Sequence, residues 1–267
     1  MIFWGEGKEI KEILEELLKD IRSVCCWFLF FIIAAEITFT YWNISVGVIM
    51  YLVILISLLT ISYSRYYESS QPLYLALTLI PMIRVISVSI PLAGIPTIFG
   101  FVLVSLPSFI AGVMVARMIG LTYTELGFTF DKLYLQFLIS LLGLPLGFIG
   151  SLIIKPGFID VAVTSKEILL WVIAFTVCIS LLEEFIFRSI LFNAALKVIG
   201  GQHAIYFVSL LYAALNISGK SLLNVIYTFL ISILFCRLFV MQKSILGLSL
   251  AHGLINIVIY VISPLVF

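Results

Sequence analysis

The chain has 267 residues, of which 63% are hydrophobic and 11% are charged, and its mean hydropathy is +1.25. Soluble domains carry about a quarter charged residues, so this composition indicates an integral membrane protein. The formal net charge of +1 and the lack of a basic cluster argue against a nucleic-acid partner. The length suits one compact helical bundle without a separate soluble domain.

Residues 1–23 carry charges before any apolar run, so we do not expect them to be a signal peptide. Apolar residues recur there at helical spacing, with charged residues on the opposite face: Ile10, Ile13, Leu14, Leu17, Leu18 and Ile21. The pattern predicts an N-terminal amphipathic helix that lies along the membrane or packs against the bundle.

Nine apolar segments of roughly membrane-spanning length follow. They are 24–42, 45–63, 73–92, 96–117, 133–154, 168–199, 203–217, 222–241 and 244–262. The segment 73–92 contains Pro81, Arg84 and Pro91, so we expect it to be broken or kinked. The segment 168–199 is too long for a simple span and should tilt or extend past the membrane surface. The predicted fold class is an all-α polytopic transmembrane helical bundle of about eight or nine spans.

The positions of the basic residues predict the orientation in the cell membrane. With a cytosolic N-terminus, eleven basic residues fall in or near cytosolic ends of the spans. Three, Lys155, Lys166 and Lys220, fall on the outer side. This distribution predicts a multi-pass protein with its N-terminus in the cytosol and, with nine spans, its C-terminus outside.

The first five spans carry only two obvious intramembrane charges, Glu36 and Arg84. We expect them to pair with each other inside the bundle, or Glu36 to lie near the headgroups. The last four spans hold the main cluster of polar residues. Among these, Asn193 and Asn224 are expected to form interhelical hydrogen bonds.

The main polar feature is Glu183-Glu184-Phe185-Ile186-Phe187-Arg188, in the middle of an apolar segment. A charge in hydrocarbon costs from a few to above about 10 kcal/mol, so such residues are usually functional. Glu184 and Arg188 are one helical turn apart on the same face. Glu183 points about 100° away from them. We therefore expect Arg188 to neutralise one carboxylate and to leave the other for chemistry.

Three further polar residues lie in later spans. His252 and Asn256 are four residues apart and share one helical face. A histidine paired in this way with an amide near an acidic helix favours a functional site. Asn216 ends the Tyr212–Asn216 segment, and by itself it is typical of a helix end.

Together these motifs resemble the CAAX-protease and bacteriocin-processing (CPBP) intramembrane proteases, which include the type II CAAX prenyl endopeptidases. The resemblance covers about residues 125–262, and Leu126-Gly127-Phe128 is similar to a segment that often precedes the core of that family. It implies a division into the amphipathic helix (1–23), N-terminal spans (24–124) and CPBP-like catalytic core helices (125–267).

The resemblance implies an intramembrane endopeptidase that removes the C-terminal tripeptide of a lipid-modified, prenylated substrate. Glu183 would activate water together with the residue at position 216. His252 and Asn256 would line the oxyanion site, and Glu184 with Arg188 would form a structural ion pair. The four helices would share a cavity that opens toward the cytosol, in contact with membrane lipids.

This chain departs from the family pattern at position 216, where Asn216 replaces a histidine; Tyr212 in place of the usual phenylalanine is a smaller change. An asparagine side chain can hold water but cannot accept a proton near neutral pH. His203 is 13 residues earlier, about 20 Å along a helix, and is too far to substitute. Three explanations remain open: Glu183 works alone, the chain is non-catalytic, or the site has been altered.

A catalytic zinc site needs three good protein ligands, and here only Glu183 and His252 qualify. We therefore favour a metal-free glutamate mechanism and predict no cofactor. One alternative is a catalytically impaired or non-catalytic CPBP relative, a binding or immunity-type membrane protein. A less favoured one is an ion-coupled transporter that uses Glu183, Arg188 and Glu36.

Overall fold

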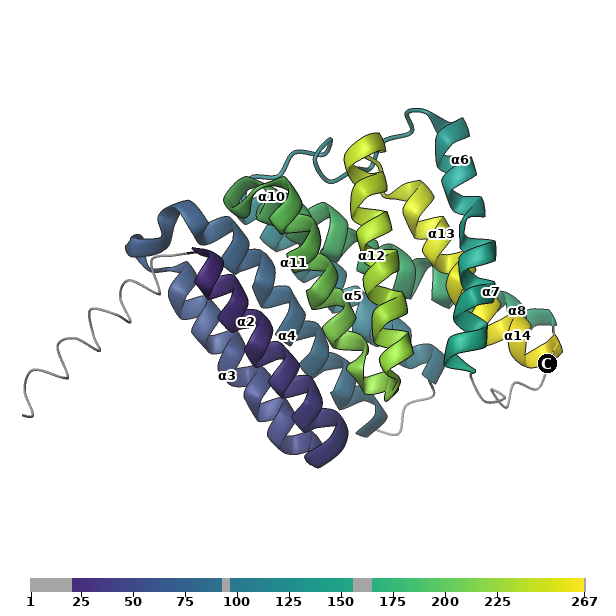
Figure 1. Ribbon diagram of the computed structural model, residues 1–267, viewed down its shortest axis with the longest axis horizontal. Coiled ribbons are helices and arrows are strands. Elements are labelled where there is room, and N and C mark those ends of the chain that lie inside the picture. The colour runs from purple at the N-terminus through teal and green to yellow at the C-terminus, as the bar shows by residue number, and fades with distance from the viewer. Residues whose placement is uncertain (1–20, 93–96, 156–164, 267) are drawn as a thin grey trace, which may run out of the picture.

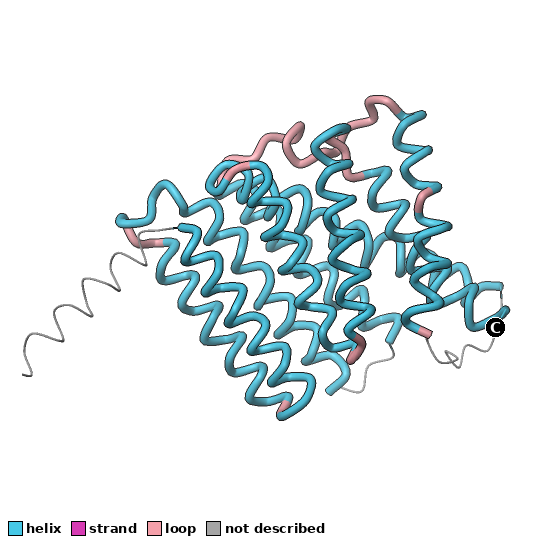
Figure 2. The backbone as a smooth tube through the Cα atoms, viewed as in Figure 1, coloured by secondary structure: helices cyan, strands magenta, loops and turns pink. Residues whose placement is uncertain are grey.

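The computed structural model describes residues 21–92, 97–155 and 165–266. Within these ranges the chain forms helices joined by short loops and contains no strand (Figures 1 and 2). The predicted all-α bundle is therefore confirmed. The predicted N-terminal amphipathic helix lies almost entirely in residues 1–20, outside the described ranges.

Each of the nine predicted segments is largely helical in its described residues. In the described residues, seven helical stretches are long and apolar enough to cross a membrane: 24–42, 44–62, 68–88, 99–118, 133–154, 168–199 and 222–242. The helices that form these stretches are α2 (Ile21–Ile37), which continues into η1 (Thr38–Trp42), α3 (Ile44–Ser62), η2 (Arg65–Ser70), α4 (Gln71–Leu92), α5 (Thr97–Met118), α6 (Leu133–Leu141), α7 (Gly143–Ile154), α8 (Ser165–Ile173), η3 (Ala174–Leu181), α9 (Leu182–Glu184), η4 (Phe185–Phe192), α10 (Asn193–Ile199) and α12 (Leu222–Gln242).

The two other predicted spans form shorter helices. Helix α11 (Gly201–Ala214) has 14 residues and continues into the 3₁₀-helix η5 (Leu215–Gly219). At 1.5 Å per residue, α11 is only about 21 Å long, which is less than the thickness of the hydrocarbon core. Helix α13 (Leu246–Ile257) continues into η6 (Val258–Ile262), and the short α14 (Ser263–Val266) follows.

The chain runs from α2, α3 and α4 on one side of the molecule to α6 and α7 on the other and then reverses, so that α11 and α12 lie between these groups (Figure 1). Helices α2, α3 and α4 form one side, and α6, α7 and α13 form the other. Helices α11 and α12 pack together between these groups, and α13 packs against both η3 and α7. The reversal is that the long helix built from α8 to α10 returns to the centre, where every side chain of η4 is buried.

Helix α4 is continuous, although Pro81 and Pro91 were expected to break or kink it. The predicted pair of Glu36 and Arg84 is present: the Arg84 guanidinium forms an ion pair with the fully buried Glu36 carboxylate. The hydroxyl of Tyr51 also donates a hydrogen bond to Glu36. This cluster joins α2, α3 and α4 and satisfies a charge that would otherwise be costly to bury.

The loop after α5 is held on the long central helix. Ser189 Oγ donates a hydrogen bond to the Leu126 carbonyl, and Asn193 Nδ2 donates to the Glu125 carbonyl. The prediction that Asn193 forms an interhelical hydrogen bond is therefore wrong, because its amide donates to Glu125 in this loop. The ammonium of Lys197, 2.8 Å from the Glu125 carboxylate, together with a backbone N–H, lowers the pKa of Glu125 to about 2. The pair thus helps to hold the loop at neutral pH, and its contribution is lost progressively as the pH falls from about 4.5, the ordinary pKa of a glutamate, to about 2.

A glycine face lets α7 approach α13, the helix that carries His252. A Cβ atom added to Gly143 would lie 2.3 Å from the Ala251 carbonyl oxygen, and one at Gly147 would lie 2.7 Å from Val258 Cβ. No real Cβ contact is that short, so only glycine permits this separation of the two helices. The position of His252 therefore depends on small residues in another helix.

We predict that Gly143→Ala lowers the melting temperature of the detergent-solubilised protein, because overpacking a close helix contact costs about 1–3 kcal/mol. The matched control is Gly201→Ala, since a Cβ atom there meets nothing within 4 Å. Thermal unfolding followed by intrinsic fluorescence measures both. Equal melting temperatures for the two variants would contradict the close contact.

Candidate active site

The Glu183–Arg188 motif lies in a helix that is not a regular α-helix. Eight-residue π-helical stretches, η3 and η4, flank the three α-helical residues Leu182–Glu184. π-Helical turns are rare and occur frequently at functional sites. The sequence carries no signal for these π-helical turns, and the spacing argument for the motif applies to a regular α-helix. The wider turns change where side chains beyond one helical turn point.

Glu184 is fully buried and uses its two carboxylate oxygens on two partners. Its Oε2 lies 3.1 Å from Arg188 Nε, as the spacing predicts. Its Oε1 lies 2.8 Å from His252 Nδ1, a contact that the sequence does not predict. An ionised carboxylate only accepts hydrogen bonds, so Nδ1 must carry the hydrogen. Glu184 therefore fixes both the guanidinium and the orientation of the imidazole ring.

Arg188 is also fully buried, and aromatic rings surround it. Its guanidinium carbon lies 4.9 Å from the centre of the Tyr212 ring and 5.5 Å from that of Phe235. Its Nη2 donates a hydrogen bond of 3.2 Å to Ser232 Oγ on α12. These contacts stabilise the cation by charge pairing, by cation–π attraction and by a hydrogen bond. Arg188 thus ties the central helix to α11 and α12.

Tyr212 lies between the other glutamate and the histidine. Its hydroxyl donates a hydrogen bond of 2.8 Å to Glu183 Oε2 and lies 3.5 Å from His252 Nε2. Glu183 Oε2 and His252 Nε2 are themselves 3.9 Å apart. Glu183, Tyr212 and His252 therefore converge from three different helices. By the motif alone, tyrosine in place of phenylalanine at position 212 is a minor change. The added hydroxyl was nevertheless the feature of the sequence that could have indicated this contact.

The two predicted asparagines are placed near this cluster, but neither has a hydrogen bond to Glu183 in the described part of the chain. Asn216 Nδ2 donates to the Tyr212 carbonyl at 2.9 Å, which caps the end of its own helix. Asn256 Nδ2 donates to Ser180 Oγ at 3.1 Å. Each amide nitrogen keeps a second hydrogen for another acceptor.

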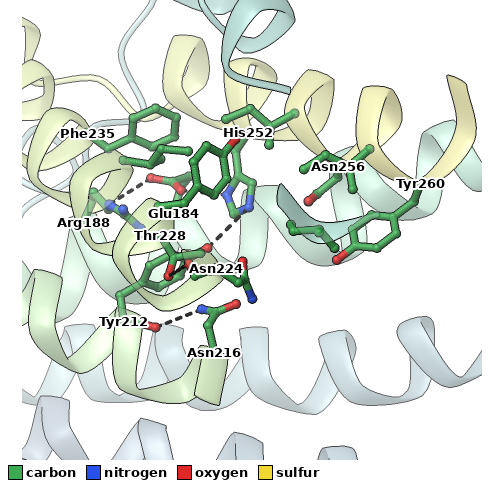
Figure 3. A pocket seen from close by; sticks show the side chains of 15 residues that line it. Glu184, Arg188, Tyr212, Asn216, Asn224, Thr228, Phe235, His252, Asn256 and Tyr260 are labelled. Carbon is green, nitrogen blue, oxygen red and sulfur yellow. Dashed lines mark hydrogen bonds and ion pairs between the residues drawn. The ribbon is translucent and has the colours of Figure 1, made fainter. Parts of the chain in front are cut away.

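A cavity of about 70 Å³ brings most of these side chains together (Figure 3). Its lining includes all the predicted site residues except Glu183: Glu184, Arg188, Asn216, His252 and Asn256. It also includes Tyr212 and Asn224. The volume is enough for several water molecules. The Glu183 side chain lies beside this space, is 36% exposed and is linked to it by the Tyr212 hydroxyl.

No group of three His, Cys, Asp or Glu side chains in the described ranges is placed to hold a metal ion. The lack of a cofactor remains a prediction from the sequence.

We predict that Glu184→Gln strongly destabilises the protein. Removing one member of a buried ion pair costs about 3–5 kcal/mol, because the charge of Arg188 stays buried without its partner. The control is the double variant Glu184→Gln with Arg188→Met, which removes both charges. The melting temperature should fall for the single variant and recover in part for the double variant. A single variant as stable as the native chain would contradict this role of Glu184.

Comparisons with known proteins agree with the motifs. The model of the family described as type II CAAX prenyl endopeptidase Rce1-like matches residues 165–258. No curated protein and no solved structure gives a significant match. The matched residues run from the start of α8 to the end of α13, and they include all the predicted site residues. The resemblance seen in the motifs is confirmed for this segment, since residues 165–258 match the model of the type II CAAX prenyl endopeptidase Rce1-like family.

Proposed function

We propose that this protein is an intramembrane endopeptidase in which Glu183 activates a water molecule. The observation that carries the proposal is the convergence of Glu183, Tyr212 and His252 beside a cavity with room for water. The family match supports CAAX-type proteolysis at the level of the family. The proposed substrate is a prenylated protein that loses its C-terminal tripeptide. The proposed site opens toward the cytosol, in a cell-membrane protein whose N-terminus is cytosolic.

In this mechanism Glu183 acts as the general base. Its carboxylate takes a proton from water, the resulting hydroxide attacks the scissile carbonyl carbon, and the same proton passes to the leaving amine. The Glu183 side chain is 36% exposed, which leaves room for a water molecule beside it. Glu184, in contrast, is fully buried and already contacts Arg188 and His252. The two adjacent carboxylates are thus suited to different tasks.

His252 is suited to stabilise the oxyanion. Glu184 accepts the hydrogen of Nδ1, and Tyr212 uses its only hydrogen on Glu183. The Tyr212 oxygen is therefore left to accept a hydrogen from His252 Nε2, 3.5 Å away. These donors and acceptors match when both ring nitrogens carry hydrogen. Such an imidazolium, paired with the Glu184 carboxylate, would offer Nε2–H to the developing negative charge.

We assign to Tyr212 the polar task that the family pattern gives to a histidine at position 216. Tyr212, near the end of α11, and Asn216, in η5, are one turn apart, and both line the cavity. Only the Tyr212 hydroxyl contacts Glu183 among the described residues of that helix. Its hydrogen bond would hold the carboxylate in place for water activation.

We predict that Glu183→Gln lowers kcat by about 10²–10⁴-fold, because an amide cannot act as the base. The assay is cleavage of a farnesylated Cys-a-a-X peptide by the purified full chain in lipid nanodiscs. The control is Glu68→Gln, which removes an exposed carboxylate from η2, and it should leave activity unchanged. A metal chelator should also have no effect. Lack of cleavage by the native chain in every lipid tested would contradict the proposed activity.

We predict that Tyr212→Phe lowers kcat at least tenfold with little change in KM, because Glu183 loses the group that holds it. Adding Asn216→His to that variant should restore part of the lost activity, since the family arrangement is then recovered. Initial rates in the same peptide assay measure both effects. Full activity of Tyr212→Phe would show that its hydroxyl has no such task.

A catalytically impaired relative is the second candidate function. It is favoured by Asn216, which cannot take a proton, and by the Tyr212 hydroxyl, which already occupies the hydrogen-bonding position on Glu183 that water would use. Activity in the Tyr212→Phe, Asn216→His double variant and none in the native chain would identify this case. The transporter hypothesis loses one of its residues, because Glu36 is paired with Arg84 and Tyr51.

A further inference from the structure

Asn224 is a buried polar residue whose side-chain oxygen has no partner. It lies near the start of α12, is 8% exposed, and lines the same cavity as His252 and Asn256 (Figure 3). Within the described ranges, no hydrogen-bond donor contacts its Oδ1 atom. The large majority of buried polar atoms have a partner, so an unsatisfied oxygen in a side chain that lines a cavity is a candidate acceptor for a ligand group.

The Asn224 side chain is not used to hold the helix. The N-cap of α12 is Ser221, whose Oγ accepts from the backbone N–H of Asn224. The backbone carbonyl of Asn224 accepts from Thr228 Oγ1 at 2.9 Å. Both contacts involve main-chain atoms of Asn224 and survive its substitution. The interhelical hydrogen bond predicted for Asn224 is not made by its Oδ1 atom.

Three carboxamides from different helical segments line this cavity: Asn216 on η5, Asn224 on α12 and Asn256 on α13. A carboxamide carries the same donor and acceptor groups as a peptide bond, so it can pair with an extended peptide backbone. The amide nitrogens of Asn216 and Asn256 are engaged by the protein. A carbonyl oxygen such as Asn224 Oδ1 attracts an N–H donor and offers nothing to an anion.

We propose that Asn224 is a substrate-binding residue whose Oδ1 accepts a hydrogen bond from a main-chain N–H of the peptide in the cavity. The inference rests on the proposed endopeptidase function and adds to it a contact outside the family motifs. The ligand is a neutral, extended peptide backbone next to the scissile bond. Water is the other donor of suitable size, and the experiment separates the two.

The test compares the native residue with leucine, which has a similar volume and no polar atom. The full chain with Glu183→Gln, which prevents turnover, is titrated against a fluorescent farnesylated Cys-a-a-X peptide, and anisotropy gives Kd. We expect Asn224→Leu to raise Kd about tenfold, the effect of one buried hydrogen bond. We also expect an unchanged or higher melting temperature, because an unsatisfied buried oxygen is removed. A lower melting temperature with unchanged Kd would overturn the inference in favour of a structural role.

The matched control is Asn43→Leu. The Asn43 side chain caps α3 by accepting from the Val46 N–H, and it is not part of the cavity lining. This substitution should lower the melting temperature and leave Kd unchanged, the opposite of the result expected for Asn224→Leu.

Ester analogues of the peptide identify the donor. Replacing one amide N–H by an ester oxygen at each position in turn should weaken binding about tenfold at a single position. That loss should disappear in the Asn224→Leu variant, because the acceptor is already gone. If every ester weakens binding equally in both proteins, water rather than a peptide N–H satisfies Asn224, and the inference is overturned.

The proposed function fails in a different way from this inference. A native chain that neither binds nor cleaves the farnesylated peptide overturns the proposed substrate class, and the contact assigned to Asn224 with it. A native chain that binds the peptide as tightly as the Asn224→Leu variant overturns only the contact.

Discussion

The buried carboxylate of Glu184 is the interaction on which the arrangement of the core depends. It lies between the guanidinium of Arg188 and the imidazole of His252, and it has no exposed surface. An isolated charge at such a position is very costly, so it persists only where partners surround it. Here the partners come from its own helix and from α13. Arg188 in turn reaches Ser232 on α12 and the Tyr212 ring on α11. One anion thus determines how four helices meet.

This arrangement explains why two adjacent glutamates have different environments. Successive side chains on a helix point about 100° apart, so Glu184 faces the core when Glu183 faces the edge of the cavity. Glu184 is then satisfied by two partners and is unsuited to exchanging a proton during turnover. Among the described residues, Glu183 accepts one hydrogen bond, from Tyr212, and its side chain is partly exposed. The difference between a fully buried, paired carboxylate and a partly exposed one follows from position alone, without any difference in residue type, and it supports the proposed role of Glu183.

Local features of the fold could be predicted, and most of the long-range contacts could not. Hydropathy is a property of contiguous residues, so the apolar segments were located well, and the pair of Glu184 and Arg188 followed from helical spacing. The pair of Glu36 and Arg84 was expected because two charges in an apolar bundle need each other. The bond between Glu184 and His252 joins residues 68 positions apart and depends on how α13 packs. Its closeness rests on the glycines of α7, whose role appears only when the two helices are seen together. The π-helical stretches also lacked any sequence signal, and they control how the motif is presented.

The sequence differs from the family pattern at Tyr212 and Asn216, and the two differences belong together in space. Tyr212 lies near the end of α11 and Asn216 lies one turn later, in η5, and both line one cavity. Position 216 is one helical turn closer to the C-terminal end of this helical segment than position 212. A polar group at position 216 would therefore enter the cavity one turn later than a group at position 212. Because a tyrosine is long, its hydroxyl covers this distance and reaches Glu183 from the earlier position. The ring beneath it packs on Arg188, so the same side chain also helps to shield the buried cation. An asparagine at position 216 is then free to cap the helix through the Tyr212 carbonyl. In this chain the polar group that contacts Glu183 therefore comes from position 212, while position 216 caps the helix.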